Sequence, residues 1–339
     1  MSVPSKHGKK ASRLALVIAL LAVIGGSLFG MHAWEKQREK QAAEALPEED
    51  PLPNERASVY YDGAWYRLRD DLETFLIMGL DKTEETINET ESYNNNQQAD
   101  FLLLMIVDKT HGSYTALHIN RDTMAEIQRL GLGGKKLNTF TGQLALAHTY
   151  GSGGKDSCRN TVKAVSRFLY DAPVDHYFSL TMDAIPVLND LVGGVTVHIN
   201  DDFSAIDPAL EQGKDVRLVG QQALTFVRSR WYVDDNSNLS RMERQRVFIT
   251  ALYEQLTGKL RENDSFGRQL AVKLADYTVS DLTTTELSNF ADRFKDYTFT
   301  GIRSLKGSAV EGERYIEFYA DDADLQKTVI ELFFERADG

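Results

Sequence analysis

Short apolar runs alternate along this chain with longer segments in which apolar residues recur every three or four positions. The short runs predict strands and the periodic segments predict helices. Strands are expected at residues 74–80, 101–107, 114–119, 176–180 and 195–199, with a further strand signal at 314–320. Helices are expected at residues 139–150, 157–170, 182–191, 220–227, 241–260, 283–294 and 323–335. Asp183 and Thr283 stand where helix N-caps are expected.

The strand predicted at 101–107 reads FLLLMIV and is apolar at every position. Such a run is typical of a strand that is buried on both faces. The sequence DKTHGS joins it to the strand at 114–119 and predicts a hairpin, so this pair should run antiparallel. Together with the alternation of strands and helices, this indicates one α/β domain with a partly antiparallel sheet.

The N-terminal segment, residues 1–34, differs from the rest of the chain in hydropathy and charge. Positions 14–34 form an uncharged, largely apolar run. As a helix this run would be about 31 Å long, close to the roughly 30 Å of a bilayer's hydrocarbon core, so we predict a transmembrane helix. The alternative is a cleaved secretory signal, but the run is long and no clear small-x-small cleavage site precedes Glu35.

The charges on either side of this run predict its orientation. Residues 1–34 carry four basic residues and no acidic residue (Lys6, Lys9, Lys10 and Arg13). The positive-inside rule places residues 1–13 in the cytoplasm, as the short tail of a single-pass cell-membrane protein. Residues 35–56 are charged, Ala-rich and then Pro-containing, and we interpret them as a stalk and linker. Residues 57–339 would then form an extracellular domain.

The composition is that of a globular protein: 42% of the 339 residues are hydrophobic and 26% are charged. The formal net charge is −12, and because residues 1–34 carry +4, the remainder carries −16. A chain this acidic lacks the net basic face that duplex nucleic acid requires, so no nucleic-acid partner is expected. The single cysteine, Cys158, excludes an intramolecular disulfide and thiolate-rich zinc sites.

Charged residues stand at the ends of three predicted strands. Asp81 follows the strand at 74–80, Asp100 precedes the strand at 101–107, and Arg121 and Asp122 follow the strand at 114–119. Open α/β folds usually bind ligands at strand ends, and an antiparallel strand would bring Asp100 to the same edge as Asp81. The alternative is that each of these charges is solvated or caps a turn.

A group of arginines lies later in the chain. Between positions 228 and 246 stand Arg228, Arg230, Arg241, Arg244 and Arg246. Guanidinium groups present a planar fork of donors to phosphate oxygens and stay charged. The alternative is that they pair with the nearby acids Asp234, Asp235 and Glu243. Combined with strand-end carboxylates, which suit a divalent cation, the arginines favour phosphoryl transfer.

The order and spacing of these motifs resemble the LytR-CpsA-Psr family over about residues 73–256. The motifs are GLDK, AD-FLLLMIVD, LHINRDT, KLNTFTGQLALAHTYGSGG, TVKAVSRFL, DHYFSLTMDAIPVLNDLVGGVTV, LVGQQALTFVRSR and SRMERQR. The resemblance implies an α-β-α sandwich with a mixed central sheet, preceded by one N-terminal transmembrane helix. It also implies a Mg²⁺-assisted glycopolymer–peptidoglycan phosphotransferase of Gram-positive envelopes, whose substrates are a glycopolymer on a polyprenyl pyrophosphate carrier (teichoic acid, capsule or a related polymer) and a peptidoglycan hydroxyl.

The resemblance further assigns roles to single residues. Asp81 and Asp100 would hold Mg²⁺, or Mn²⁺ in its place, and would act in catalysis with Arg121 and Asp122. The pyrophosphate would be bound by Arg121, Arg228, Arg230, Arg241, Arg244 and Gln245. Two positions depart from the family's pattern: Gln98 replaces an arginine two residues before Asp100, and Asn238 stands near where an aspartate is frequent. Asp234 or Asp235 could substitute for that aspartate.

In the mechanism that the resemblance suggests, a peptidoglycan hydroxyl attacks the phosphorus next to the donor sugar, and polyprenyl phosphate leaves. Asp81, Asp122 or Asp234 could take the hydroxyl proton, and the sequence does not choose among them. Two other functions stay open. A membrane-anchored polyprenyl-pyrophosphate hydrolase would use the same residues with water as the acceptor. A non-catalytic envelope regulator or binding module fits less well, because the short tail before the predicted span, residues 1–13, leaves no cytoplasmic DNA-binding domain.

Overall fold

The computed structural model describes residues 58–81, 94–233, 235, 237–263, 266–283, 286 and 297–337. A six-stranded sheet runs through the centre in the order β11-β8-β3-β4-β5-β12. Its strands are β3 (Leu72–Leu80), β4 (Ala99–Asp108), β5 (Ser113–Ile119), β8 (His176–Thr181), β11 (Thr278–Ser280) and β12 (Thr298–Ser304). β4 is antiparallel to β3 and β5, whereas β8 is parallel to β3 and β12 is parallel to β5. The predicted mixed, partly antiparallel sheet is therefore confirmed.

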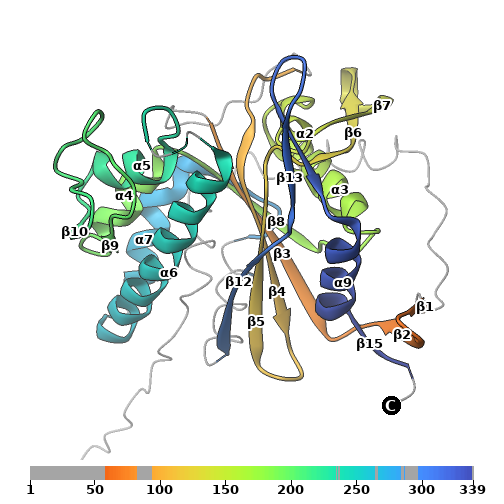
Figure 1. Ribbon diagram of the computed structural model, residues 1–339. Helices are drawn as coiled ribbons and strands as arrows, with labels where there is room; N and C mark the ends of the chain where they lie inside the picture. Colours follow the sequence, from red (N-terminus) through yellow and green to blue (C-terminus); the bar gives the residue numbers. More distant parts are fainter. Residues whose placement is uncertain are drawn as a thin grey trace, which may run out of the picture.

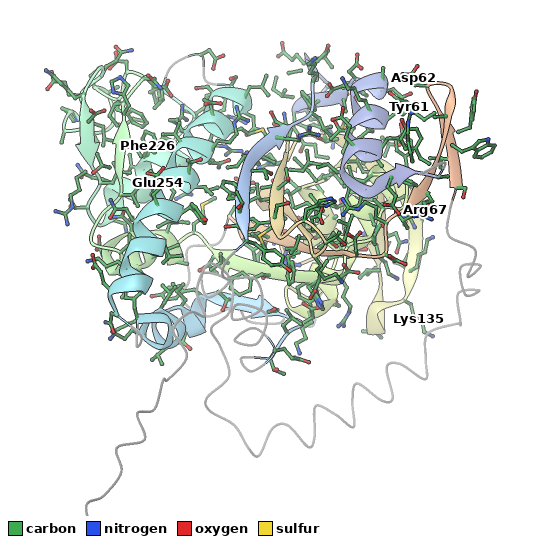
Figure 2. All side chains as sticks on the ribbon, turned by 90° about the horizontal axis from the view of Figure 1, so that it is seen from below. Tyr61, Asp62, Arg67, Lys135, Phe226 and Glu254 are labelled. Carbon is green, nitrogen blue, oxygen red and sulfur yellow. The ribbon has the colours of Figure 1, made fainter. Side chains whose placement is uncertain are left out.

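Helices cover both faces of this sheet, which gives the three layers visible in Figure 1. On one face lie α4 (Ala184–Leu191), α5 (Gln221–Arg228), α6 (Asn238–Glu262) and α7 (Phe266–Leu274). On the other lie α2 (Leu146–Thr149), α3 (Lys155–Phe168) and α9 (Asp322–Phe333). Side chains fill the space between the sheet and these layers, Phe226 of α5 among them (Figure 2).

The central strand β4 contributes to both cores. Met105 and Val107 pack on the side of α4–α7, whereas Leu102, Leu104 and Ile106 pack on the side of α2, α3 and α9. Successive side chains of a strand point to opposite faces, so an unbroken apolar run is what two buried faces require. The prediction from FLLLMIV is confirmed.

The predicted helix at residues 139–150 is wrong. Lys136–Gln143 forms β7, which pairs antiparallel with β6 (Met124–Leu130), and only the four residues of α2 are helical. The Thr-Phe-Thr-Gly sequence at 139–142 explains the difference, because β-branched and aromatic residues favour strands and Gly142 weakens a helix. Pairing with β6 decides between the two conformations.

The strand predicted at 195–199 is β9 (Thr196–His198), but it pairs with β10 (Asp215–Arg217) and is not part of the central sheet. The strand signal at 314–320 is β14 (Ile316–Ala320), which forms a hairpin with β13 (Gly307–Glu311). The last predicted helix ends earlier than expected, at Phe333. β15 (Phe334–Arg336) follows it and joins β2 (Ala64–Leu68) and β1 (Ser58–Tyr61) in a small sheet. Short 3₁₀ helices span Leu132–Gly134 and Ala275–Tyr277.

The two predicted N-caps have different outcomes. Asp183 occupies the N-cap position of α4, but its side chain makes no capping hydrogen bond there. The Thr283 hydroxyl accepts from the backbone amide of Glu286 at 3.3 Å, and the Glu286 carboxylate accepts from the Thr283 amide at 2.8 Å. This reciprocal pair is a capping box. The rest of the helix expected at 283–294 lies largely outside the described residues.

The predicted tail, transmembrane helix and stalk (residues 1–56) also lie outside the described residues. Within the part that is described, no helix is both long and apolar enough to cross a membrane. Cys158 is a buried free thiol on α3.

Candidate functional site

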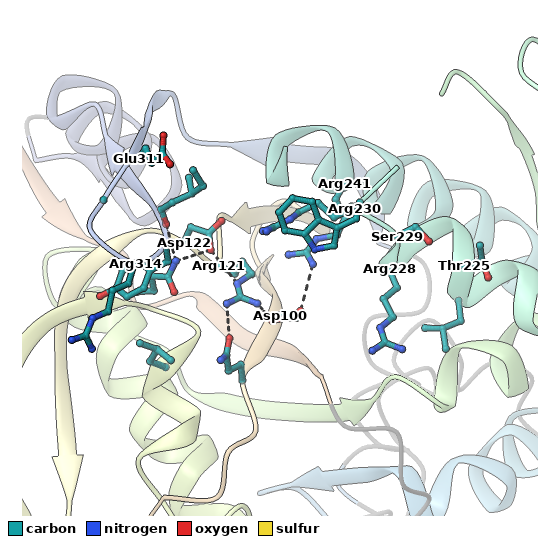
Figure 3. Close-up of a pocket in the computed structure, with 18 of the residues that line it drawn as sticks. Asp100, Arg121, Asp122, Thr225, Arg228, Ser229, Arg230, Arg241, Glu311 and Arg314 are labelled. Carbon is teal, nitrogen blue, oxygen red and sulfur yellow. Dashed lines mark hydrogen bonds and ion pairs between the residues drawn. The ribbon is translucent and has the colours of Figure 1, made fainter. Parts of the chain in front are cut away.

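A pocket of about 1030 Å³ opens at the edge of the central sheet where β4 begins and β5 ends. Three parts of the chain line it. The edge of the central sheet, the end of β7 and the start of α2 contribute Gln98, Asp100, Arg121, Asp122, Gln143 and Leu146. The α5–α6 region contributes Gln221, Leu224, Thr225, Arg228, Ser229, Arg230, Trp231 and Arg241, and the β13–β14 hairpin contributes residues 311–316. Figure 3 shows the labelled charged side chains gathering there from all three parts.

Asp100 reaches the pocket through an irregularity in the sheet. Gly79 of β3 pairs with Phe101, but the next residue, Leu80, pairs with Ala99. Asp100 is therefore the extra residue of a β-bulge, a feature that redirects a side chain. Gly79 allows the strands to approach here, because a Cβ atom on it would lie 2.9 Å from Cβ of Phe101.

Two arginines hold the Asp100 carboxylate. Its Oδ1 accepts from Nη1 of Arg121, and its Oδ2 accepts from Nη1 of Arg241 at 3.4 Å. The three side chains are nearly buried, with exposed fractions of 12% for Asp100, 14% for Arg121 and 7% for Arg241. The Asp100 carboxylate thus neutralises one of the two guanidinium charges. The positive charge that remains attracts an anion, and burial strengthens this attraction.

Asp122 is the most buried carboxylate of the pocket. Its Oδ1 accepts from Nε2 of Gln143 at 2.9 Å and lies 3.2 Å from Nε of Arg121. Its Oδ2 is buried and has no hydrogen-bond partner in the described structure. Burial raises the pKa of Asp122, against the opposing charges of Arg121, Arg241 and Arg230. A carboxylate with a free oxygen and a raised pKa is suited to accept a proton.

A chain of hydrogen bonds connects Arg241 to Asp122. Nη2 of Arg241 donates to Oδ1 of Asn238, and Nδ2 of Asn238 donates to Oδ1 of Asn120 at 2.6 Å. The same Asn120 oxygen accepts from the backbone amide of Asp122 at 2.9 Å. Asn238, which departs from the family's pattern, thereby orients Arg241. Nε of Arg241 is buried and has no hydrogen-bond partner among the residues described.

Arg228 is the last residue of α5 and Arg230 lies two residues beyond it, and both line the pocket. Neither forms an ion pair with a described residue. The guanidinium of Arg230 stacks on the indole of Trp231, with Cζ 4.6 Å from the ring centroid. The side chains that the sequence grouped as Asp100, Arg121, Asp122, Arg228, Arg230 and Arg241 therefore meet in one pocket, with donors free to bind an anion.

Arg244 and Gln245 lie outside the pocket lining. Arg244 donates to the backbone oxygens of Phe226, at 3.1 Å, and of Ser229. Gln245 donates through Nε2 to the backbone oxygen of Val227 at 3.2 Å. Both side chains are buried and hold the chain on either side of Arg228, so the structure gives them a positioning role.

Asp81 also lies outside the pocket lining, next to Gln98. Its Oδ1 accepts from the Gln98 amide at 2.7 Å, and its own amide donates to the Gln98 carbonyl at 3.0 Å. Burial raises the pKa of Asp81, and the negative charge of Asp100 raises it further. Gln98 itself lines the pocket, and its Oε1 accepts from Nη2 of Arg121.

The oxygen donors near Asp81 bear on whether a divalent cation could bind there. No group of three or more His, Cys, Asp or Glu side chains that could hold a metal is found among the described residues. Two carboxylates, Asp81 and Asp100, are close enough that the charge of one opposes ionisation of the other. Mg²⁺ commonly binds one or two carboxylates and completes its shell with substrate phosphates and water, so these two residues supply the type of oxygen donor that such an ion takes.

The β13–β14 hairpin is a part of the site that the sequence motifs do not indicate. Nε2 of Gln143 donates both to Asp122 and, at 2.8 Å, to the backbone oxygen of Ile316. The Phe318 amide donates to the backbone oxygen of Asp122 at 2.9 Å. The only sequence signal was the charged stretch EGER at 311–314, which reads equally well as a solvated turn. Asp235 is exposed and lies outside the lining, and Asp234 lies outside the described residues.

Comparisons with known proteins agree on one family. A model described as the LytR_cpsA_psr family matches residues 32–331. A polyisoprenyl-teichoic acid–peptidoglycan teichoic acid transferase, TagU of Halalkalibacterium halodurans, is 31% identical over 206 residues, which span 61% of this chain and 60% of that protein. TagU of Bacillus licheniformis is 25% identical over 330 residues, which span 96% and 97% of the two chains. The solved structure of TagT bound to LIIa-WTA matches with a TM-score of 0.57 at 20% identity, over 78% of this chain and 90% of that one, and shows the shared fold.

Proposed function

Since the chain belongs to the LytR-CpsA-Psr family, we propose that it is a phosphotransferase that moves a glycopolymer from a polyprenyl pyrophosphate carrier to a peptidoglycan hydroxyl. The relatives named as teichoic acid transferases support teichoic acid or a related polymer as the cargo. The observation that carries the proposal is a pocket lined by five arginines and two nearly buried aspartates. That arrangement suits an anion with several oxygens more than a neutral ligand.

The pyrophosphate of the donor would bind among Arg121, Arg228, Arg230 and Arg241. Arg228 and Arg230 have no carboxylate partner among the described residues, and Arg241 has a buried Nε–H without an acceptor. The three arginines line the pocket before any ligand arrives, so little reorganisation opposes binding. Arg244 and Gln245 would act on the ligand indirectly, by fixing the chain that carries Arg228.

In the proposed reaction, the acceptor oxygen forms a bond to the phosphorus next to the donor sugar. The bond from that phosphorus to the bridging oxygen breaks, and polyprenyl phosphate leaves. Asp122 lines the pocket and takes the hydroxyl proton; its buried Oδ2 has no hydrogen-bond partner among the described residues. The arginines stabilise charge on the phosphoryl oxygens, so the residues contribute mainly position and electrostatics.

Asp81 and Asp100 would hold Mg²⁺, or Mn²⁺, which prefers the same hard oxygen donors. When bound, the ion would neutralise part of the pyrophosphate charge. The charge of Asp100 disfavours the ionised form of Asp81, and a cation between them would remove that cost.

We also propose that residues 14–34 anchor the chain in the cell membrane, with residues 1–13 in the cytoplasm and residues 57–339 outside. The apolar length and the basic residues before it support this topology. It would place the pocket on the side where peptidoglycan lies, with the lipid carrier in the same membrane.

The direct test incubates the full-length chain in detergent with a polyprenyl-pyrophosphate-linked saccharide and a peptidoglycan fragment. The expected product is a phosphodiester between saccharide and fragment. Arg228→Ala and Arg230→Ala should each lower kcat/KM about 10- to 100-fold, as expected for one charge-assisted contact. Arg303→Ala is the matched control, because Arg303 is exposed and pairs with Glu331 away from the pocket.

The same assay separates the alternatives. Release of saccharide phosphate with acceptor present would indicate a hydrolase, and donor binding without any product would indicate a binding module. Asp81→Ala and Asp100→Ala should each abolish the Mg²⁺ dependence of the rate. A retained response to Mg²⁺ would contradict the proposed metal ligands.

A further inference from the structure

The pocket is larger and more varied than a pyrophosphate needs. Pockets of roughly 300–1,000 Å³ enclose whole drug-sized ligands, and this one measures about 1030 Å³. Besides the arginines, it is lined by two exposed aromatic residues, Trp231 and Tyr315, with exposed fractions of 64% and 40%. Exposed aromatic rings in a pocket indicate a ligand with an apolar face.

The two ends of the lining differ in charge: the hairpin carries two acids and one arginine, whereas the α5–α6 region carries three arginines and no acid. Figure 3 shows Glu311 and Arg314 of the β13–β14 hairpin across the pocket from Arg228. Glu311 and Glu313 would repel phosphate groups, whereas carboxylates are good acceptors for the hydroxyl groups of a neutral ligand. The hairpin end therefore suits a hydroxylated ring, and the arginine end suits the pyrophosphate.

Trp231 belongs to the α5–α6 part of the lining and contacts Arg230. Arg230 stacks on one face of the indole, and the charge of Arg230 is close enough to act on Asp122 and Arg241. With 64% of the residue exposed, the indole retains surface to which a ligand can bind. The neighbouring Tyr232 is more exposed, at 80%, but lies outside the lining, so exposure alone does not mark Trp231.

From these observations we propose a saccharide subsite at the pocket mouth, in which Trp231 stacks on a pyranose ring of the acceptor and the hairpin residues Glu311 and Tyr315 contact the same sugar. The assignment to the acceptor rests on the proposed function. The hairpin is hydrogen-bonded to Asp122 through Phe318 and Gln143, so a sugar at this end would present its hydroxyl to the proposed base.

The first experiment measures sugar binding without turnover. The probe is the soluble N-acetylglucosamine–N-acetylmuramic acid tetrasaccharide, added to the full-length chain in detergent and followed by titration calorimetry. Trp231→Ala should weaken binding about tenfold, Trp231→Phe should retain most of it because the ring remains, and Trp65→Ala should leave it unchanged. Trp65 is a fitting control, since it is 51% exposed and lies on β2, outside the lining.

The second experiment measures transfer. Trp231→Ala should raise KM for the peptidoglycan fragment about tenfold and leave kcat nearly unchanged, which a general loss of folding would not do. The donor KM should change much less, because only the stacking of Arg230 on the indole is lost. A raised donor KM with an unchanged acceptor KM would assign the sugar to the donor and overturn the acceptor subsite.

The outcomes also separate this inference from the proposed function. Trp231-dependent binding of the tetrasaccharide without any transfer would support the subsite while the proposed function fails. Transfer that is indifferent to Trp231→Ala, with equal tetrasaccharide affinity, would overturn the subsite and leave the proposed function intact.

Discussion

Replacing Arg244 with alanine tests the role that the structure gives to this side chain. Arg244 is 5% exposed and pairs with Asp201, which is 15% exposed. It also donates to Ser240 Oγ at 2.9 Å and to the backbone oxygens of Phe226 and Ser229. Its donors thus tie α6 to the end of α5, from which Arg228 and Arg230 enter the pocket.

The expected loss can be worked from these contacts. Removing one partner of a buried ion pair costs about 3–5 kcal/mol, because the remaining charge is left without compensation. Each backbone oxygen left unsatisfied adds about 1–3 kcal/mol, but Ser229 is half-exposed and water can replace its donor. We expect Arg244→Ala to lower the free energy of unfolding by about 4 kcal/mol. Arg244→Lys should lose about half as much, because it keeps a charge for Asp201 but not the planar fork.

Urea unfolding followed by circular dichroism measures this quantity, and Arg246→Ala is the matched control. Arg246 lies two residues further along α6, is 25% exposed, and pairs with Glu243, which is 57% exposed. Such a surface pair contributes about 0–1 kcal/mol. If Arg244→Ala were no less stable than Arg246→Ala and yet lost donor binding, Arg244 would contact the ligand directly and the positioning role would be refuted.

Three further predictions concern the site and its support. Burial raises the pKa of Asp122, so the rate should rise with pH as this carboxylate loses its proton. Asp122→Asn should remove that rise and lower kcat about 10²- to 10⁴-fold. A pH–rate profile that is the same in Asp122→Asn would exclude Asp122 as the base. Burial lowers the pKa of His118 from 6.5 to about 3. Between these two pH values the unfolded chain binds a proton that the folded chain does not, so the free energy of unfolding falls as the pH is lowered. His118→Gln should reduce this slope by about 1.4 kcal/mol per pH unit in urea unfolding at pH 5.5 and 4.5, and an equal slope would contradict the prediction. Gly79→Ala should lower stability by about 1–3 kcal/mol, because its Cβ would lie 2.9 Å from that of Phe101, and an unchanged melting temperature would show that the strands can separate without cost.

The charges of the pocket explain how an acidic protein could bind the proposed polyanion. The chain carries −12 overall, yet Arg228 and Arg230 have no carboxylate partner among the residues described, and Asp100 is matched by two arginines. The acidic surface and the basic pocket are separate features, because electrostatic attraction for a bound group is set by charges within a few ångströms.

The pattern of apolar and polar residues was sufficient to predict the strands that are buried along their length. β3, β4, β5 and β8 were found because apolar runs report burial directly. The pattern gave a wrong prediction at residues 139–150. Residues 139–143 belong to the strand β7, which pairs with β6. Local propensity was ambiguous there, and the hydrogen bonds of β6 decided the outcome.

By itself, the sequence identified charged residues that the structure brings to one pocket: the strand-end acids Asp100 and Asp122, and arginines within residues 228–246. It did not separate Arg241 from Arg244, because residues three apart on a helix share a face. Only the tertiary structure decides that Arg241 reaches Asp100 while the end of α5 takes up the donors of Arg244.

Nor does the sequence show that the β13–β14 hairpin borders Asp122. The backbone of Phe318 meets the segment after β5 through the Thr123–Phe318 bridge, which joins positions far apart in the chain. Periodicity and motif spacing report the surroundings of one segment at a time, whereas a pocket is built where distant segments pack together. The sequence therefore indicates the charged residues of the pocket, whereas the tertiary fold determines which distant segments form its lining.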